Sequence, residues 1–315
     1  MTFRWRRGWI LAIVGAAGLA LATAAPAQVT VTVDGDTAHA DISLTSPTGE
    51  TYEAEATIVF DTPMNLSPES LNVTAELVDP AEIDPRLPPD DLPLLCGAGG
   101  GVAMDPAFPM MITVEPLDIP WLFATGFDGG SARGGLEFVN TYSFEIHTHD
   151  LFYEPHSQYR VFKAPIGEAF IDITNDVEAG SVRARGRHGA FSQFVIAKDT
   201  RSLHGLPLVH ALCGVYAEKT NALLGYILGA LIGDVLRLDL LNLLAKVVAL
   251  IPIDVLGAIG ALDDLIATID ENAGTELPNV WRASHDVTNS AGEMKGIAEA
   301  LRFDLQESLD TSANP

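Results

Sequence analysis

Apolar and polar residues alternate along the chain from Gln28 to about Arg201, which predicts β-strands in this part of the sequence. The segments 29–33, 52–60 and 71–77 place apolar residues at nearly every second position, so these side chains share one face of a strand. Further strands are expected at residues 110–115, 136–148, 159–163, 181–187 and 191–198, with turn residues between them. Many short strands separated by turns predict an antiparallel β-sandwich over residues 28–204.

From about Gly205 the spacing of apolar residues changes to every third or fourth position, which predicts helices. In the segment 254–272, Ile259, Leu262, Ile266 and Ile269 form one stripe. Other helices are expected at residues 207–219, 220–236 and 239–251, with Asp239 and Asp254 as N-caps. These helices predict a small α-helical bundle over residues 205–275.

The C-terminal segment 276–315 fits two structures. Met294, Ile297, Leu301, Leu305 and Leu309 have helical spacing, whereas Leu301, Phe303 and Leu305 alternate as in a strand. We favour a final strand that returns to the sandwich.

The first 27 residues have the layout of a secretory signal peptide. Arg4, Arg6 and Arg7 precede an apolar run over residues 9–22, and small residues lead to Ala25-Pro26-Ala27. Cleavage is expected before Gln28, which would make the protein secreted or periplasmic. An uncleaved N-terminal anchor is the alternative, but the apolar run is short for a membrane span.

Composition excludes some partners. The chain has 315 residues, is 48% hydrophobic, and carries a formal net charge of −24, which would repel the phosphates of nucleic acids. No transmembrane span is expected after residue 27, because charged residues interrupt the apolar helices at Asp234, Arg237, Asp239, Lys246, Asp254 and Asp263. A membrane-surface or partner contact through residues 205–272 remains an alternative to a buried bundle, since residues 223–232 contain almost no polar side chain.

The two cysteines, Cys96 and Cys213, are 117 positions apart. An oxidising compartment would allow a disulfide between them. Cys213 also lies in an apolar stretch, where a buried free thiol is equally natural.

The most concentrated group of chemically active side chains comprises Glu145, His147, His149, Asp150 and His156. On a strand, residues 145, 147 and 149 share one face. Two imidazoles and a carboxylate can hold zinc or another divalent metal. The alternative, which we favour, is a polar strand face whose histidines bond to neighbours or water.

Arg183, Arg185 and Arg187 also alternate and therefore share a strand face. In so acidic a chain we expect them to pair with the protein's own carboxylates. An anionic-ligand patch, for lipopolysaccharide or polysaccharide, is the alternative.

Three consecutive segments carry a resemblance to known proteins: residues 170–177 (FIDITNDV), 180–186 (GSVRARG) and 191–197 (FSQFVIA). They resemble the closing strands of immunoglobulin-like domains in exported bacterial proteins. Together with residues 161–163, they are similar to an uncharacterised family of secreted proteobacterial proteins with no assigned activity. The resemblance implies export and an immunoglobulin-like β-sandwich. Together with the helices expected from the spacing after residue 205, the predicted fold class is α+β, an antiparallel immunoglobulin-like β-sandwich followed by a small α-helical bundle. It assigns no catalytic residue.

These observations favour an exported, non-enzymatic envelope or extracellular protein with a binding or structural role. Its expected partner is an envelope protein or a polysaccharide. The alternative is a divalent-metal protein, with or without hydrolase activity, centred on His147 and His149.

Overall fold

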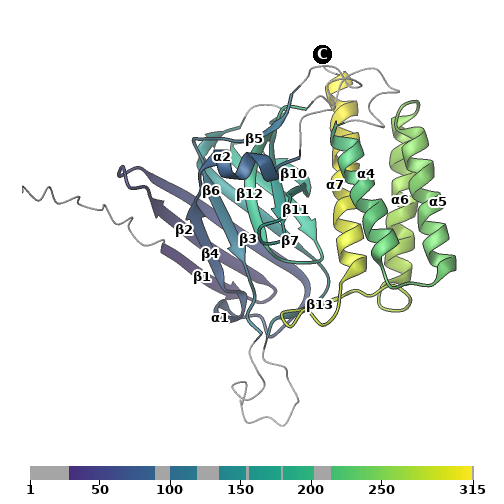
Figure 1. Ribbon diagram of the computed structural model, residues 1–315, viewed down its shortest axis with the longest axis horizontal. Coiled ribbons are helices and arrows are strands. Elements are labelled where there is room, and N and C mark those ends of the chain that lie inside the picture. Colours follow the sequence, from purple (N-terminus) through teal and green to yellow (C-terminus); the bar gives the residue numbers. More distant parts are fainter. Residues whose placement is uncertain are drawn as a thin grey trace, which may run out of the picture.

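A computed structural model describes residues 28–88, 100–118, 135–153, 156–178, 180–201 and 214–313 (Figure 1). The signal peptide expected at residues 1–27 and the cysteine pair Cys96 and Cys213 lie outside the described residues. So does the boundary expected between residues 204 and 205.

Two antiparallel sheets form the β-rich part of the molecule. The first has the order β1 (Gln28–Asp34), β2 (Thr37–Thr45), β3 (Thr51–Met64), β7 (Glu137–Phe152), β11 (Ser181–His188), β10 (Thr174–Glu178), and β13 (Val280–Arg282) also pairs with β7. The second has the order β4 (Val73–Leu77), β6 (Met110–Val114), β12 (Gln193–Asp199), β8 (Tyr159–Ala164), β9 (Ile171–Asp172), and β5 (Val102–Met104) pairs with β12. The strands predicted from the alternating pattern are confirmed, and with the helices they make an α+β fold.

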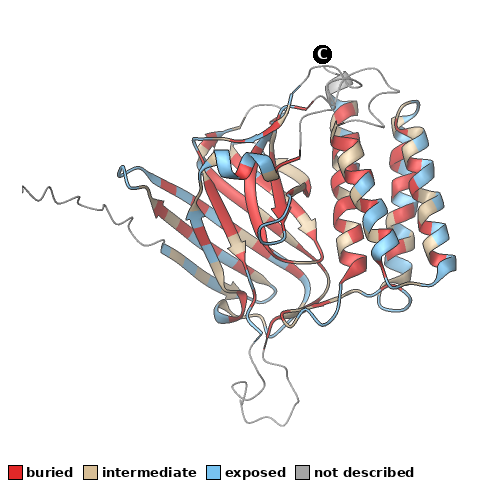
Figure 2. Ribbon diagram, in the orientation of Figure 1, coloured by how far each residue is buried: buried red, intermediate tan, exposed pale blue. Residues whose placement is uncertain are grey.

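Register brings the apolar positions of neighbouring strands into rows. Ala40 pairs with Ala56, Ala56 pairs with Ile146, and Ile146 pairs with Ala184. All four side chains are buried. Because side chains alternate along each strand, the positions between them face the opposite side of the sheet, and Figure 2 shows this alternation of buried and more exposed residues in β2 and β3.

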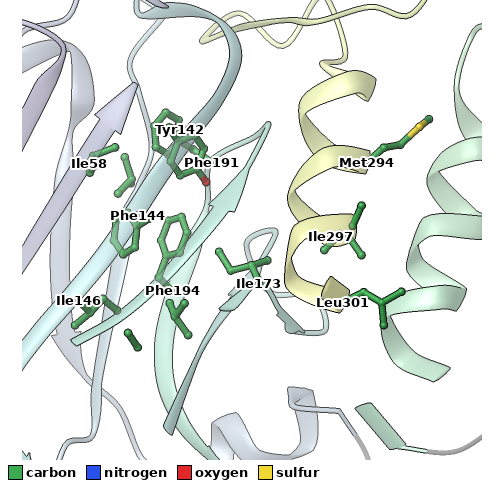
Figure 3. Close-up of a cluster of buried hydrophobic side chains, with 14 of the residues drawn as sticks. Ile58, Tyr142, Phe144, Ile146, Ile173, Phe191, Phe194, Met294, Ile297 and Leu301 are labelled. Atoms are coloured by element: carbon green, nitrogen blue, oxygen red, sulfur yellow. The ribbon is translucent and has the colours of Figure 1, made fainter. Parts of the chain in front are cut away.

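Aromatic side chains fill the space between the two sheets (Figure 3). The rings of Phe144 and Phe194 stack with centroids 3.9 Å apart, and those of Tyr142 and Phe191 stack at 4.2 Å. Phe144 comes from the first sheet and Phe194 from the second, so these contacts join the two layers. A separate apolar cluster lies on the other side of the second sheet. It packs between that sheet and the short helices α2 (Pro80–Ile83) and η1 (Asp84–Arg86).

Four longer helices form a bundle beside the sandwich: α4 (Gly214–Gly229), α5 (Asp234–Leu250), α6 (Val255–Asn272) and α7 (Ser290–Ala313). A further short helix, α1 (Pro68–Leu71), precedes β4. In Figure 1 the bundle lies along one side of the sandwich, with α7 next to β10 and β11. Asp254 caps α6 as expected, accepting a hydrogen bond from Gly257 N at 2.9 Å, whereas Asp239 lies inside α5 and is not a cap.

The prediction of a final strand at Leu301–Leu305 is wrong, because these residues lie in α7. Figure 3 shows Met294, Ile297 and Leu301 pointing from α7 towards the neighbouring helix, so the helical spacing decides the structure. The C-terminal segment does return a strand to the first sheet, but this strand is β13, which precedes α7.

Two glycines allow α7 to approach the backbone of the first sheet. A Cβ atom added to Gly296 would lie 2.3 Å from the carbonyl oxygen of Arg187, and one added to Gly292 would lie 2.3 Å from that of Asn140. Residues four apart share one helix face. The side of α7 opposite its apolar stripe therefore packs directly on main chain.

Buried ions also join the bundle to the sandwich. Lys219 of α4 donates to Asp172 of β9 at 2.7 Å and to Asp304 of α7, and all three side chains are out of contact with water. Arg201 donates to Asp199 at 2.6 Å and to Glu218 of α4 at 2.8 Å. Burial raises the pKa of Asp304 to about 7, although the positive charge of Lys219 acts to lower this pKa.

Lys163 is buried at the same interface. Burial lowers the pKa of Lys163 to about 8, although the negative charge of Glu293 on α7 acts to raise it. His188 is also buried, which lowers its pKa well below the ordinary value. Ala190 N donates to His188 Nδ1 at 3.1 Å, so the neutral ring carries its proton on Nε2, 3.4 Å from Tyr226 Oη. Titratable groups thus line the contact between helices and sheets.

We predict that Gly296→Ala destabilises the protein by about 1–3 kcal/mol, because the added methyl group overlaps the Arg187 carbonyl and forces α7 off the sheet. Thermal unfolding followed by circular dichroism measures the effect. Gly225→Ala in α4 is the matched control, because nothing lies within 4 Å of its added Cβ, and it should be neutral or stabilise by up to about 1 kcal/mol. Equal effects of both substitutions would contradict the close packing of α7.

We predict that stability falls as pH rises from about 4 to 7. The pKa of Asp304 is raised from 3.8 to about 7 in the folded protein, so the folded state holds a proton that the unfolded state has released. Between pH 5.5 and pH 8 this group alone should remove about 2 kcal/mol of unfolding free energy.

Asp304→Asn tests the assignment, because an amide oxygen can still accept from Lys219 but cannot ionise. Chemical unfolding at the two pH values should show a smaller difference for this variant than for the wild type. An unchanged pH dependence would assign the effect to other groups.

Candidate functional site

The first sheet presents a polar surface on the side opposite its core. Register places residues of three strands in rows, and we call these nine positions of β3, β7 and β11 the outer face. Glu55 pairs with His147 and His147 with Arg183, and the next rows are Thr57–Glu145–Arg185 and Val59–Ser143–Arg187. The sequence prediction that Glu145, His147 and His149 share a strand face, as do the three arginines, agrees with this register.

A groove of about 690 Å³ runs along the outer face beside α7; its lining includes Glu145, Asp176, Arg185, Arg187 and Glu299. We call it the acidic groove. Its floor comes from rigid strands, and Glu299 on α7 forms one wall. The groove is therefore built from both the sandwich and the bundle.

Carboxylates surround both arginines of the acidic groove. Arg185 contacts Glu145 at 2.5 Å, Glu178 at 3.3 Å and Asp176 at 3.4 Å. Burial would lower the pKa of Arg185, but the hydrogen bond and charge of Glu145 outweigh it and raise the pKa. This guanidinium is saturated by the protein's own acids.

Arg187 contacts Asp61 at 2.9 Å and Glu299 at 3.8 Å. Burial raises the pKa of Glu299, against the charge of Arg187. The expected pairing of arginines with the protein's own carboxylates thus holds for Arg185 and Arg187. Arg183 is exposed and has no hydrogen bond or ion pair with any residue that the structure describes.

A second groove, of about 410 Å³, lies at the other end of the outer face; its lining includes Asp41, Glu53, Glu55, His147 and His149. We call it the histidine groove. The ring centroids of His147 and His149 are 4.7 Å apart. The two histidines therefore lie side by side, as the alternation predicts.

Both ring nitrogens of His147 already have partners. Nδ1 lies 3.1 Å from Glu55 Oε2, and Nε2 lies 2.5 Å from Ser181 Oγ. The hydrogen bond from His147 lowers the pKa of Glu55, and the charge of Arg183 lowers it further, against a raising effect of burial.

The structure does not bring the five predicted metal ligands together. Glu145 is bound to Arg185, Asp150 accepts from Glu53 N at 3.0 Å, and His156 lies 3.8 Å from Glu307 on α7. Within the described ranges, no three His, Cys, Asp or Glu side chains are arranged to hold a metal ion. The predicted ligands are not free for a metal ion because His147 and Glu145 already form hydrogen bonds with side chains of neighbouring strands.

Sequence reasoning missed two residues of this site, Glu55 and Ser181. Each lies on a strand that the alternating pattern did predict, but their partner His147 is 92 and 34 positions away. Only the strand order and register bring them together, and neither follows from local alternation.

A family model matches residues 11–308 of the chain. The chain belongs to DUF6689, a family of unknown function. No curated protein and no solved structure shows significant similarity to it. The expected resemblance to an uncharacterised family is confirmed at this level, and membership in the family assigns no activity to the two grooves.

Proposed function

We propose that the protein is an exported binding protein whose acidic groove holds a basic segment of another envelope or extracellular protein. One observation carries the proposal: five carboxylates, those of Asp61, Glu145, Asp176, Glu178 and Glu299, surround two guanidinium groups. Negative charge remains after internal pairing. Lysine or arginine side chains of a partner would therefore be attracted to this groove and anionic ligands repelled.

The charge of the whole chain supports the same partner. With a formal net charge of −24, the protein attracts cations over long distances and accelerates their encounter with an acidic groove. Of the two partner classes expected from sequence, an envelope protein and a polysaccharide, the groove favours the protein. Arg185 and Arg187 are already neutralised, which argues against a patch for lipopolysaccharide.

Export is part of the proposal, and the N-terminal sequence supports it. Three arginines, an apolar run over residues 9–22 and the Ala25-Pro26-Ala27 site are typical of a cleaved signal peptide. The secreted or periplasmic location follows from this pattern. An immunoglobulin-like arrangement of the two sheets belongs to the same proposal, because such sandwiches commonly serve in cell-surface proteins.

We predict that a fluorescein-labelled decapeptide of alternating lysine and serine binds the wild type, with an affinity that falls as salt is raised. The double variant Glu145→Gln/Asp176→Asn should weaken this binding about tenfold, since each ion pair that a carboxylate of the groove forms with the peptide contributes about 1 kcal/mol or less. Fluorescence anisotropy at salt concentrations of about 50 and about 300 mM measures both effects. The screening length falls from roughly one and a half nanometres at the lower concentration to roughly half a nanometre at the higher one.

The double variant Asp263→Asn/Asp264→Asn is the control. It also removes two carboxylates that each have a basic partner, Arg302 and Lys246, but they lie on the bundle. Its affinity should stay within about twofold of wild type. Equal losses in both double variants would show attraction by overall charge and would refute a specific groove.

A second candidate function is contact with a lipid surface through the α4–α5 turn. Leu228, Leu231 and Val235 are exposed, Leu231 to 90%, and apolar side chains gathered at one turn are typical of interfacial contacts. None of the helices in the described part of the chain combines the length and apolar character needed to cross a bilayer.

We predict that the wild type floats with vesicles of zwitterionic phosphatidylcholine, because an acidic chain would be repelled by anionic lipid. Leu231→Glu/Val235→Glu should abolish flotation, since burying two carboxylates in the interface is unfavourable. Ile166→Glu is the control, because Ile166 is also exposed but lies on the loop between β8 and β9. If wild type stays in the soluble fraction, this second function is wrong.

A further inference from the structure

Ser181, His147 and Glu55 form a continuous hydrogen-bonded chain across three neighbouring strands. Ser181 Oγ lies 2.5 Å from His147 Nε2, and His147 Nδ1 lies 3.1 Å from Glu55 Oε2. A hydroxyl, an imidazole and a carboxylate in this order form the arrangement that activates serine nucleophiles, whatever the fold that carries it.

The proton positions follow from the chemistry of the three groups. An ionised carboxylate can only accept hydrogen bonds, so His147 must carry its proton on Nδ1 when it contacts Glu55. In the neutral ring Nε2 then has a free lone pair. The Ser181 hydroxyl donates to this lone pair. A general base requires this tautomer of His147, with the proton on Nδ1 and Nε2 free to accept.

The relay is held by regular structure. His147 is only 7% exposed, and Glu55 and Arg183 are its direct cross-strand partners. Ser181 is partly exposed and follows Gly180, whose φ of +120° is accessible mainly to glycine. The base is therefore fixed inside the sheet surface, while the hydroxyl remains open to a substrate.

Arg183 supplies a positive charge beside the relay. It lies two residues after Ser181 and therefore on the same face of β11, and its charge acts on Glu55. Unlike Arg185 and Arg187, it has no ion-pair partner among the residues with described positions. An unpaired guanidinium at this place can stabilise the oxyanion that forms when a hydroxyl attacks a carbonyl group.

We propose that Ser181 is the nucleophile of an esterase site that hydrolyses short-chain carboxylic esters of polar alcohols. Polar residues such as Thr30, Asp41, Ser43 and Glu53 line most of the adjoining histidine groove. The two aliphatic side chains of its lining, Ile42 and Ala54, are buried, so a long acyl chain would meet few apolar side chains there, whereas an acetyl group and a hydroxylated alcohol would fit.

The reaction balances with water as the only co-reactant. Ser181 Oγ bonds to the ester carbon as its proton moves to His147 Nε2, and the carbonyl electron pair becomes an oxyanion beside Arg183. The oxyanion collapses, the bond to the alcohol oxygen breaks, and the leaving alcohol takes the proton from Nε2. Water then attacks the acyl-serine in the same way, which releases the carboxylic acid and restores Ser181.

This site is separate from the acidic groove, and its test is independent of the proposed binding function. The full chain is incubated with a biotinylated fluorophosphonate, which reacts with activated serines, and the labelled peptide is mapped by mass spectrometry. In parallel, hydrolysis of p-nitrophenyl acetate is followed by absorbance. We expect the label on Ser181 and a hydrolysis rate at least about 100-fold above that of Ser181→Ala, as is typical of general-base activation.

Three further variants sharpen the test. His147→Gln should lose activity about as completely as Ser181→Ala, whereas Glu55→Gln should lose only a few-fold, because the Glu55 side chain is 66% exposed and water screens its charge. Ser143→Ala, on the same face but outside the relay, should retain wild-type labelling and activity.

The proposal is overturned if the wild type takes no label at Ser181, a result that needs no variant to fold. It is also overturned if Ser181→Ala hydrolyses the ester as fast as wild type. Labelling of Ser181 that persists in His147→Gln would remove His147 as the base.

Discussion

The buried ammonium group of Lys219, held between Asp172 and Asp304, determines how the two halves of the molecule fit together. The three side chains come from β9, α4 and α7 and have no contact with water. Removing such ions from water costs several kcal/mol for each, and only their mutual contact offsets that cost. Withdrawing α4 would leave Asp172 without its counter-charge, and withdrawing β9 would leave Lys219 with only Asp304, whose raised pKa favours its neutral form. The bundle is therefore fixed against one particular edge of the sandwich.

This constraint leaves the outer face of the first sheet open. With the helices against β10 and β11 (Figure 1), β3 keeps most of its polar side exposed, whereas on β7 Glu145 is half-buried and His147 is buried. The two grooves on this surface differ in chemistry. The acidic groove near α7 has more carboxylates than arginines, and the histidine groove at the other end contains His147, whose two ring nitrogens both form hydrogen bonds. One sheet thus carries two sites that differ in charge and reactivity.

The elements of the sandwich could be predicted because alternation is a local property of a strand. β2 alternates as well and was missed in the expected set, although Ala38, Ala40 and Ile42 are all buried. At the C-terminus, Leu301, Phe303 and Leu305 alternate over too short a stretch to outweigh a helical stripe that spans four turns. The outer-face histidines and arginines were found for the same local reason.

The site itself could be predicted only in part. Which side chains share a face follows from the sequence, but which ones touch depends on strand order. Glu145 contacts Arg185 and His147 contacts Glu55 because β7 lies between β3 and β11. This strand order gives both of these predicted metal ligands other partners, which spacing alone did not indicate. Ser181 has no local signature, since a serine after a glycine is common in turns.

The return of β13 and α7 to the first sheet has a consequence for how the chain matures. Strand β7 is synthesised more than a hundred residues before β13 pairs with it, and Asp172 precedes Asp304 by a similar distance. A nascent chain that has made all strands up to β12 already contains β3 and β11, the two main partners of β7, but it still lacks β13 beside the start of β7 and the buried partners of Asp172. The first sheet therefore gains its last strand, and Asp172 its partner on α7, only after β13 and α7 have been made.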